Sequence, residues 1–180
     1  MVRKILNSKE PSLRQKSKPV AKIDKKVSQL INDLKDTLRI QKDPEGVGLA
    51  APQIGKNVRV FVCDYKGFKR VVVNPKILKI GNIARHAAHK KEKKQRREIL
   101  EGCLSLPNYY GPLERAGEIT VKYLDENGKD TTETFTGFNA QIILHEIDHL
   151  NGVLFLDRLF EQKKPLYRVE GSEWEEVDLP

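Results

Sequence analysis

The chain has 180 residues, of which 38% are hydrophobic and 32% are charged, so we expect a single soluble domain over residues 1–180. The net charge is +8, and residues 83–98 contribute much of it through seven Lys/Arg against two Glu. No apolar run is long enough for a transmembrane helix or a signal peptide, and Cys63 and Cys103 are too few for a disulfide framework. These features exclude a membrane protein and predict a cytoplasmic one.

The first predicted helix begins after Asp24 and ends before residues 43–44. Asp24 is a residue type that caps helix N-termini, and the following apolar residues recur at helical spacing: Val27, Leu30, Ile31, Leu34 and Leu38. We interpret this segment as a scaffold helix that packs on a sheet and exposes its charged face to solvent.

A glycine-rich stretch follows at residues 46–55, with the sequence GVGLAAPQIG. Because this stretch is rich in Gly, Ala and Pro, it carries few large side chains, and another backbone could approach it closely. The Gln53 amide could donate a hydrogen bond. An ordinary glycine-rich connection is the alternative. Residues 58–63 are predicted to form a strand. Residues 70–80 form one or two more, interrupted at residues 74–75.

Residues 82–98 combine helix-forming composition with almost no apolar face. Such a segment cannot bury itself in a core, so we expect a protruding basic insertion. It could contact RNA phosphates, while a solvated charge run is the alternative. A protein that acts only as a basic RNA-binding module through residues 85–97 is also a hypothesis.

The segment most informative about function is residues 141–152, QIILHEIDHLNG. In a helix, His145 and His149 lie one turn apart on one face, while Ile143 and Ile147 face the other way. Two such imidazoles can ligate one metal ion, and Glu146 between them is placed to move a proton. Alternatively, the histidines are ordinary polar residues of a core.

A catalytic metal site needs a third protein ligand. The extended motif that would supply a histidine has Phe155 at that position. Glu170 or Glu173 would suit a small metallopeptidase, but both lie in the acidic tail at about residues 161–180, which shows no evident element from residue 170 onward. Cys103, in EGCLSLP at residues 101–107, is the better third ligand.

Residues 118–137 predict a hairpin around an Asn-Gly turn at residues 127–128. A scaffold helix, short strands and then a helix with a metal-ligand pair indicate an α+β fold. We expect mixed or antiparallel β-sheets packed around a central HExxH metal-binding helix.

Three motifs together resemble the peptide deformylase family: GVGLAAPQ at residues 46–53, EGCLS at 101–105 and QIILHEIDHLNG at 141–152, in the family's order. The similarity spans roughly residues 5–159. The basic insertion departs from the usual pattern, and the tail lacks the long basic helix that some members carry. The resemblance implies a metal-dependent hydrolase that removes the formyl group from the N-terminal formylmethionine of nascent polypeptides and releases formate. The ribosome would be a transient partner.

The resemblance also implies roles for particular residues. Cys103, His145 and His149 would hold one divalent metal ion, which in the family is commonly Fe2+; the donors also suit Zn2+, Ni2+ or Co2+. Glu146 would act as general base and then general acid. The Gln53 side chain and the Leu104 backbone N–H would stabilise the oxyanion.

We expect a formylmethionyl peptide to bind as an added strand beside the Gly46, Val47 and Gly48 backbone and the segment that begins at Ser105. An apolar pocket for the methionine side chain would include Leu104, Phe138 and Ile142. Arg115 resembles a position near the substrate in the family, although a surface arginine is an equally good interpretation.

Overall fold

The computed structural model describes residues 1–42, 45–82 and 100–179. The predicted basic insertion at residues 82–98 therefore lies, apart from its first residue, outside the described part. The first half of the chain contains η1 (Pro11–Arg14), α1 (Lys25–Arg39), β1 (Gly48–Ala50), η2 (Ala51–Ile54), β2 (Val60–Tyr65) and β3 (Phe68–Ile80). The second half contains β4 (Glu101–Cys103), β5 (Leu106–Gly111), β6 (Glu118–Leu124), β7 (Asp130–Thr136), α2 (Gly137–Leu150), α3 (Phe155–Gln162), β8 (Leu166–Glu170) and β9 (Glu173–Val177).

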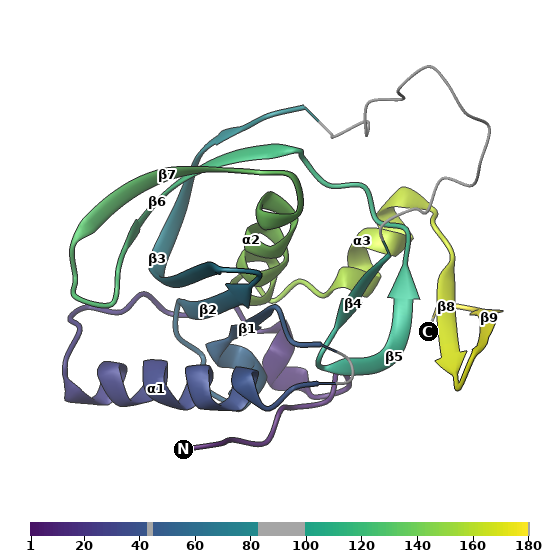
Figure 1. The fold of residues 1–180 in the computed structure, drawn as a ribbon, viewed down its shortest axis with the longest axis horizontal. Coiled ribbons are helices and arrows are strands. Elements are labelled where there is room, and N and C mark those ends of the chain that lie inside the picture. Colours follow the sequence, from purple (N-terminus) through teal and green to yellow (C-terminus); the bar gives the residue numbers. More distant parts are fainter. Residues whose placement is uncertain (43–44, 83–99, 180) are drawn as a thin grey trace.

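The strands form two sheets, of order β1-β2-β3-β6-β7 and β4-β5-β8-β9, and all pairs within them are antiparallel (Figure 1). This arrangement confirms the predicted α+β class. The Asn-Gly hairpin is also confirmed: β6 pairs with β7, and Gly128 adopts φ of 81° in the turn between them. Glycine reaches this left-handed region without a steric penalty.

Helix α1 begins where the sequence predicts. The Asp24 carboxylate accepts hydrogen bonds from the backbone N–H groups of Lys26 and Val27, both at 2.9 Å. These bonds satisfy two of the donors that a helix N-terminus leaves unpaired. The helix buries Leu34 and Leu38 against apolar residues of β1 and β2, so it is the scaffold helix that the periodicity predicts.

Strand β3 is longer than expected, because the Asn-Pro pair bends it without ending it. Asn74 adopts φ of 53°, and the pairing with β6 shifts register between Val73 and Lys76. The Asn74 side chain accepts from the Val20 N–H and donates to the Val20 carbonyl, both at 2.8 Å. These two hydrogen bonds stabilise a β-bulge at Asn74, so the strand continues through the Asn-Pro pair.

Helix α2 is central. It packs against β1, β2, β6, β7 and η2, and in Figure 1 the long β6–β7 hairpin curves around it. Ile143, Ile147 and Leu150 are buried with Phe61 and Val121 in one apolar cluster. The opposite face of the helix is thereby directed toward β4 of the second sheet.

The prediction that the acidic tail has no regular element is wrong. Helix α3 is followed by the hairpin β8–β9, which extends the second sheet beside β5. Leu166 and Val177 of the hairpin pack in a cluster with Phe155 and Leu159 of α3. Among the residues that the structure describes, no helix combines the length and apolarity that a membrane crossing requires.

Candidate active site

Three side chains from distant parts of the sequence meet between the sheets. Cys103 comes from the end of β4, and His145 and His149 come from α2. The Cys103 Sγ lies 3.2 Å from Nε2 of His149, which in turn lies 3.2 Å from Nε2 of His145. One ligand atom from each residue lies within 4.8 Å of the other two. The structure thus assembles the sulfur and two nitrogens that the sequence proposes as metal ligands.

Local structure explains this convergence. The four-residue spacing on α2 places both imidazoles on one face of the helix. The pairing of β4 with β5 shifts register between Gly102 and Cys103, at the point where the strand meets α2. Such irregularities re-aim side chains, as is common near functional sites.

The charge state of Cys103 suits a metal ligand. Burial alone would raise the pKa of its thiol, but the charges and hydrogen bonds of His149 and His145 hold that pKa well below its ordinary value. The thiolate is the form that binds metals. A thiolate and two imidazoles fit a divalent transition metal, and three protein ligands leave a position open for water or substrate.

The alternative third ligands do not join this group. Glu170 and Glu173 face each other across the β8–β9 hairpin, and both are exposed. Within the described ranges, Cys103 is the residue that accompanies the two histidines. The metallopeptidase hypothesis therefore has no support from the geometry.

Glu101 is the site residue that the sequence reasoning missed. Its Oε1 lies 2.7 Å from Nδ1 of His145, so it orients the imidazole. The Arg115 guanidinium donates two hydrogen bonds of 2.6 Å to the same carboxylate. Burial would raise the pKa of Glu101, but Arg115 and His145 hold it far below its usual range. The signal was available, because residues i and i+2 of a strand share a face, as Glu101 and Cys103 do.

Arg115 requires a correction. It was expected either beside the substrate or on the surface, but its side chain is only 8% exposed and is not among the described residues that line the cavity. Besides Glu101, it binds Asp148 at 2.9 Å, and Arg158 holds the other oxygen of Asp148 at 2.7 Å. Arg115 therefore positions Glu101 and, through it, His145.

Replacing Glu101 with Gln is expected to reduce metal affinity or kcat/KM by about 10–100-fold, the usual cost of losing a partner of a metal ligand. Gln keeps the shape of the side chain but loses the charge that both His145 and Arg115 use. The matched control is Asp148→Asn, which also weakens an ion pair of Arg115 without touching His145. Chelator competition gives the metal affinity, and equal losses in the two variants would contradict the assigned role.

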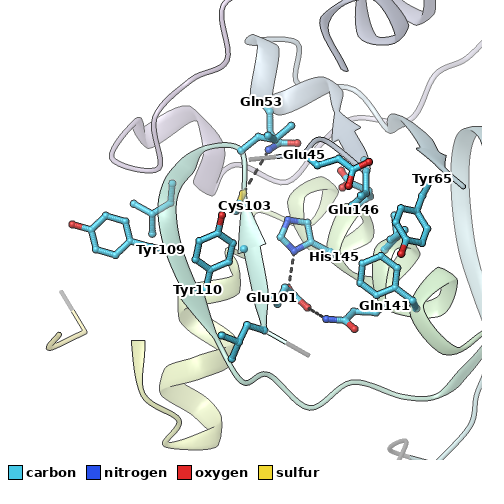
Figure 2. Close-up of a pocket in the computed structure, with 18 of the residues that line it drawn as sticks. Glu45, Gln53, Tyr65, Glu101, Cys103, Tyr109, Tyr110, Gln141, His145 and Glu146 are labelled. Atoms are coloured by element: carbon cyan, nitrogen blue, oxygen red, sulfur yellow. Dashed lines mark hydrogen bonds and ion pairs between the residues drawn. The ribbon is translucent and has the colours of Figure 1, made fainter. Parts of the chain in front are cut away.

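Two residues of the metal-ligand group formed by Cys103, His145 and His149 line a cavity of about 420 Å³, namely Cys103 and His145. Figure 2 shows the labelled side chains of Gln53, Cys103, His145 and Glu146 arranged around one space. The lining includes most of the predicted substrate and oxyanion residues, namely Val47, Gly48, Gln53, Leu104, Phe138 and Ile142. Gly46 and Ser105 are not among the described lining residues. Ser105 is instead buried behind the wall, at 1% exposure.

Gln53 has a fixed orientation. Its Oε1 accepts from the Ala50 N–H at 2.8 Å, so its Nε2 must point the other way. That nitrogen donates to the Ser105 hydroxyl at 3.2 Å and lies 3.6 Å from the Cys103 sulfur. The side chain thus presents a positioned donor beside the metal-ligand group, and Ser105 helps to hold it.

Glu146 lies against the backbone of Gly48. A Cβ atom at position 48 would fall 2.3 Å from the Glu146 Oε1, so only glycine allows this approach. The carboxylate is buried, and its Oε2 is without a hydrogen-bond partner in the described part of the chain. Burial raises the pKa of Glu146 to about 7, although the neighbouring histidines oppose the shift.

A sulfur and two nitrogens suited to one metal ion, beside a buried carboxylate and an oriented amide donor, are typical of metal-dependent hydrolases. The family model described as Polypeptide deformylase matches residues 2–165. The chain belongs to the peptide deformylase family, whose members are metal-dependent hydrolases that remove the N-formyl group from nascent polypeptides. The family resemblance seen in the sequence is thereby confirmed.

Individual relatives agree with this assignment. A peptide deformylase of Pseudothermotoga lettingae is 41% identical over 174 residues, which covers 94% of this chain and 92% of the relative. The peptide deformylase of Thermus thermophilus superposes with a TM-score of 0.76 at 38% identity, covering 90% of this chain and 88% of that one. For the enzyme from Legionella pneumophila the TM-score is 0.75 at 41% identity, with 88% and 86% covered.

Proposed function

We propose that this chain deformylates the N-terminal formylmethionine of nascent polypeptides with Cys103, His145 and His149 as the ligands of one divalent metal ion. The observation that carries the proposal is the meeting of these three donor atoms within 4.8 Å, with Cys103 and His145 lining the same cavity as Glu146 and Gln53. We propose Fe2+ as the ion in the cell, and Zn2+, Ni2+ or Co2+ suit the same donors. When bound, such an ion supplies Lewis acidity, which lowers the pKa of water from about 15.7 toward 7.

Glu146 moves the protons. Its carboxylate faces the cavity beside Gly48, with one oxygen free of protein partners among the described residues. It takes a proton from the attacking water and returns it to the departing amine nitrogen, first as general base and then as general acid. The buried environment keeps this proton from exchanging with bulk solvent before it is returned.

Gln53 and Leu104 stabilise the negative charge that develops on the formyl oxygen. The Gln53 amide is already oriented by the Ala50 N–H and the Ser105 hydroxyl, so it does not have to reorganise during the reaction. The Leu104 backbone N–H follows Cys103 directly and supplies the second donor. Loss of one such donor typically costs about 3 kcal/mol of transition-state stabilisation.

The cavity wall provides the substrate site. The backbone at Val47 and Gly48 pairs with the peptide as an added strand. Gly46 supports this segment on one side of the peptide, and Ser105 supports the segment on the other side. Leu104, Phe138 and Ile142 form the apolar surface for the methionine side chain. Phe138 is itself held by Tyr65, with ring centroids 4.8 Å apart.

A nascent substrate implies the ribosome as a transient partner and a cytoplasmic location. Direct contact between ribosomal RNA and the basic insertion at residues 82–98 stays a prediction, because all but the first of those residues lie outside the described ranges.

Formate release from formyl-Met-Ala-Ser tests the proposal. Protein purified without oxygen should release formate, lose this activity on chelation, and regain it when Fe2+, Zn2+, Ni2+ or Co2+ is returned. The bound metal is quantified at each step, and acetyl-Met-Ala-Ser serves as the control substrate. Formate release that persists after all metal has been removed, or no release by metal-loaded protein, would refute the assignment.

A further inference from the structure

The outer face of the four-stranded sheet carries three aromatic side chains, Tyr110, Tyr167 and Trp174, which we call the aromatic strip. Tyr110 of β5 pairs with Gly102 of β4 on one side and with Tyr167 of β8 on the other. Trp174 of β9 pairs with Val169, two residues beyond Tyr167. Since directly paired residues and residues two apart share a face, all three aromatic residues lie on the same side of the sheet.

This face begins at the proposed active site. Gly102 and Tyr110 both line the catalytic cavity, and a Cβ atom at position 102 would fall 2.7 Å from the Tyr110 ring. The Tyr110 ring therefore rests on the Gly102 backbone. Its centroid lies 5.6 Å from that of Trp174, with the planes tilted by 44°. The aromatic surface is thus continuous from the cavity wall to the outermost strand.

The two faces of the hairpin differ. On the inner face, Leu166 and Val177 pack on α3. On the outer face, Trp174 is 53% exposed although it is the largest side chain of the hairpin. Figure 1 shows β8 and β9 at the edge of the molecule, on the far side of β5 from α1. Exposed aromatic surface that is continuous with a binding cavity is typical of an extension of that site.

We propose that the aromatic strip binds apolar side chains of the substrate polypeptide beyond its first three residues, an inference that rests on the proposed deformylase function. Three strand spacings of about 4.8 Å separate β4 from β9, which an extended peptide crosses in about four residues. With the formylmethionine paired beside Val47 and Gly48, and the residues after it turning at Gly102 to cross the face of the second sheet, Trp174 is reached at about the fifth residue. The hairpin that the sequence left without structure is therefore a contact surface for longer substrates.

Kinetics on three peptides test this proposal: formyl-Met-Ala-Ser, a formyl heptapeptide with Phe and Leu at positions five and six, and an equally long one with Ser there. None carries an acidic residue, because Glu176 shares the face with Tyr167. In the unchanged protein the apolar heptapeptide should have a kcat/KM about threefold to tenfold above the polar one, the range of a single aromatic contact. The difference should lie in KM, because the contact is remote from the reacting bond.

Trp174→Ala should remove the preference, and Trp174→Phe should restore most of it. The matched control is Phe160→Ala, which removes another exposed aromatic residue, on α3, and should leave the preference intact. An equal preference in Trp174→Ala and in the unchanged protein would overturn the proposal. If formyl-Met-Ala-Ser itself is not deformylated, the failure belongs to the proposed function instead.

Fluorescence gives a direct second test, because Trp174 is the only tryptophan in the chain. Its emission should shift to shorter wavelength when the apolar heptapeptide is added, and the polar heptapeptide should produce no shift. A shift that depends on protein concentration and not on peptide would make this face a self-association surface and would overturn the proposal.

Discussion

Replacing Cys103 with Ala is expected to abolish formate release and to lower metal affinity by more than the 10–100-fold that loss of an outer partner costs. The physical reason is the loss of the thiolate, the only donor of this group that comes from the second sheet. Two imidazoles on one helix then remain, with no third protein ligand from the described residues. Metal content after gel filtration and the kcat for formyl-Met-Ala-Ser measure the two effects.

The matched control is Cys63→Ala. Cys63 is also buried, at 3% exposure, but it lies in β2 within the main apolar cluster. Burial raises the pKa of its thiol well above the usual value, so it stays a neutral thiol. This control should keep its metal and its activity and should lose only some stability. If Cys103→Ala also kept both, the third ligand would have to lie elsewhere, as in the metallopeptidase hypothesis.

Features that depend on short-range patterns could be predicted from the sequence. Asp24 caps α1 because its carboxylate needs only the next two or three backbone N–H groups. The β6–β7 turn forms because Gly128 adopts a positive φ and the Asp125 carboxylate accepts hydrogen bonds from the N–H groups of Asn127 and Lys129. His145 and His149 share a helix face through their spacing. Cys103 needed a further argument, the missing third ligand, because no local pattern connects it to α2.

Features that depend on tertiary packing were missed. Hairpin β8–β9 has an acidic, mostly exposed sequence, and only its position beside β5 and α3 makes it an ordered part of the sheet. Arg115 was expected near the substrate from the family resemblance, and nothing local in the sequence reveals its two buried carboxylate partners. Glu101 was overlooked although it lies two residues before Cys103, because its partners His145 and Arg115 come next to it only in the folded chain.

Replacing Glu146 with Gln is expected to lower kcat by about 10²–10⁴-fold, the contribution that a positioned general acid–base group makes. Gln has nearly the same shape, so it fits against the Gly48 backbone that already touches this side chain. It cannot accept and return a proton, while the three metal ligands and the cavity wall remain unchanged. The loss should therefore fall on kcat, with KM and metal content close to those of the unchanged protein.

A second carboxylate-to-amide change controls for a general effect of charge. Glu126 lies at the exposed β6–β7 turn and pairs only with Lys35 among the described residues. Glu126→Gln should therefore leave kcat unchanged. A Glu146→Gln variant with kcat within about tenfold of the unchanged protein would show that another group carries the proton. Loss of metal from the Glu146→Gln variant would instead show that Glu146 supports the metal ligands. Retained metal together with lost turnover is the result that separates proton transfer from metal binding at this site.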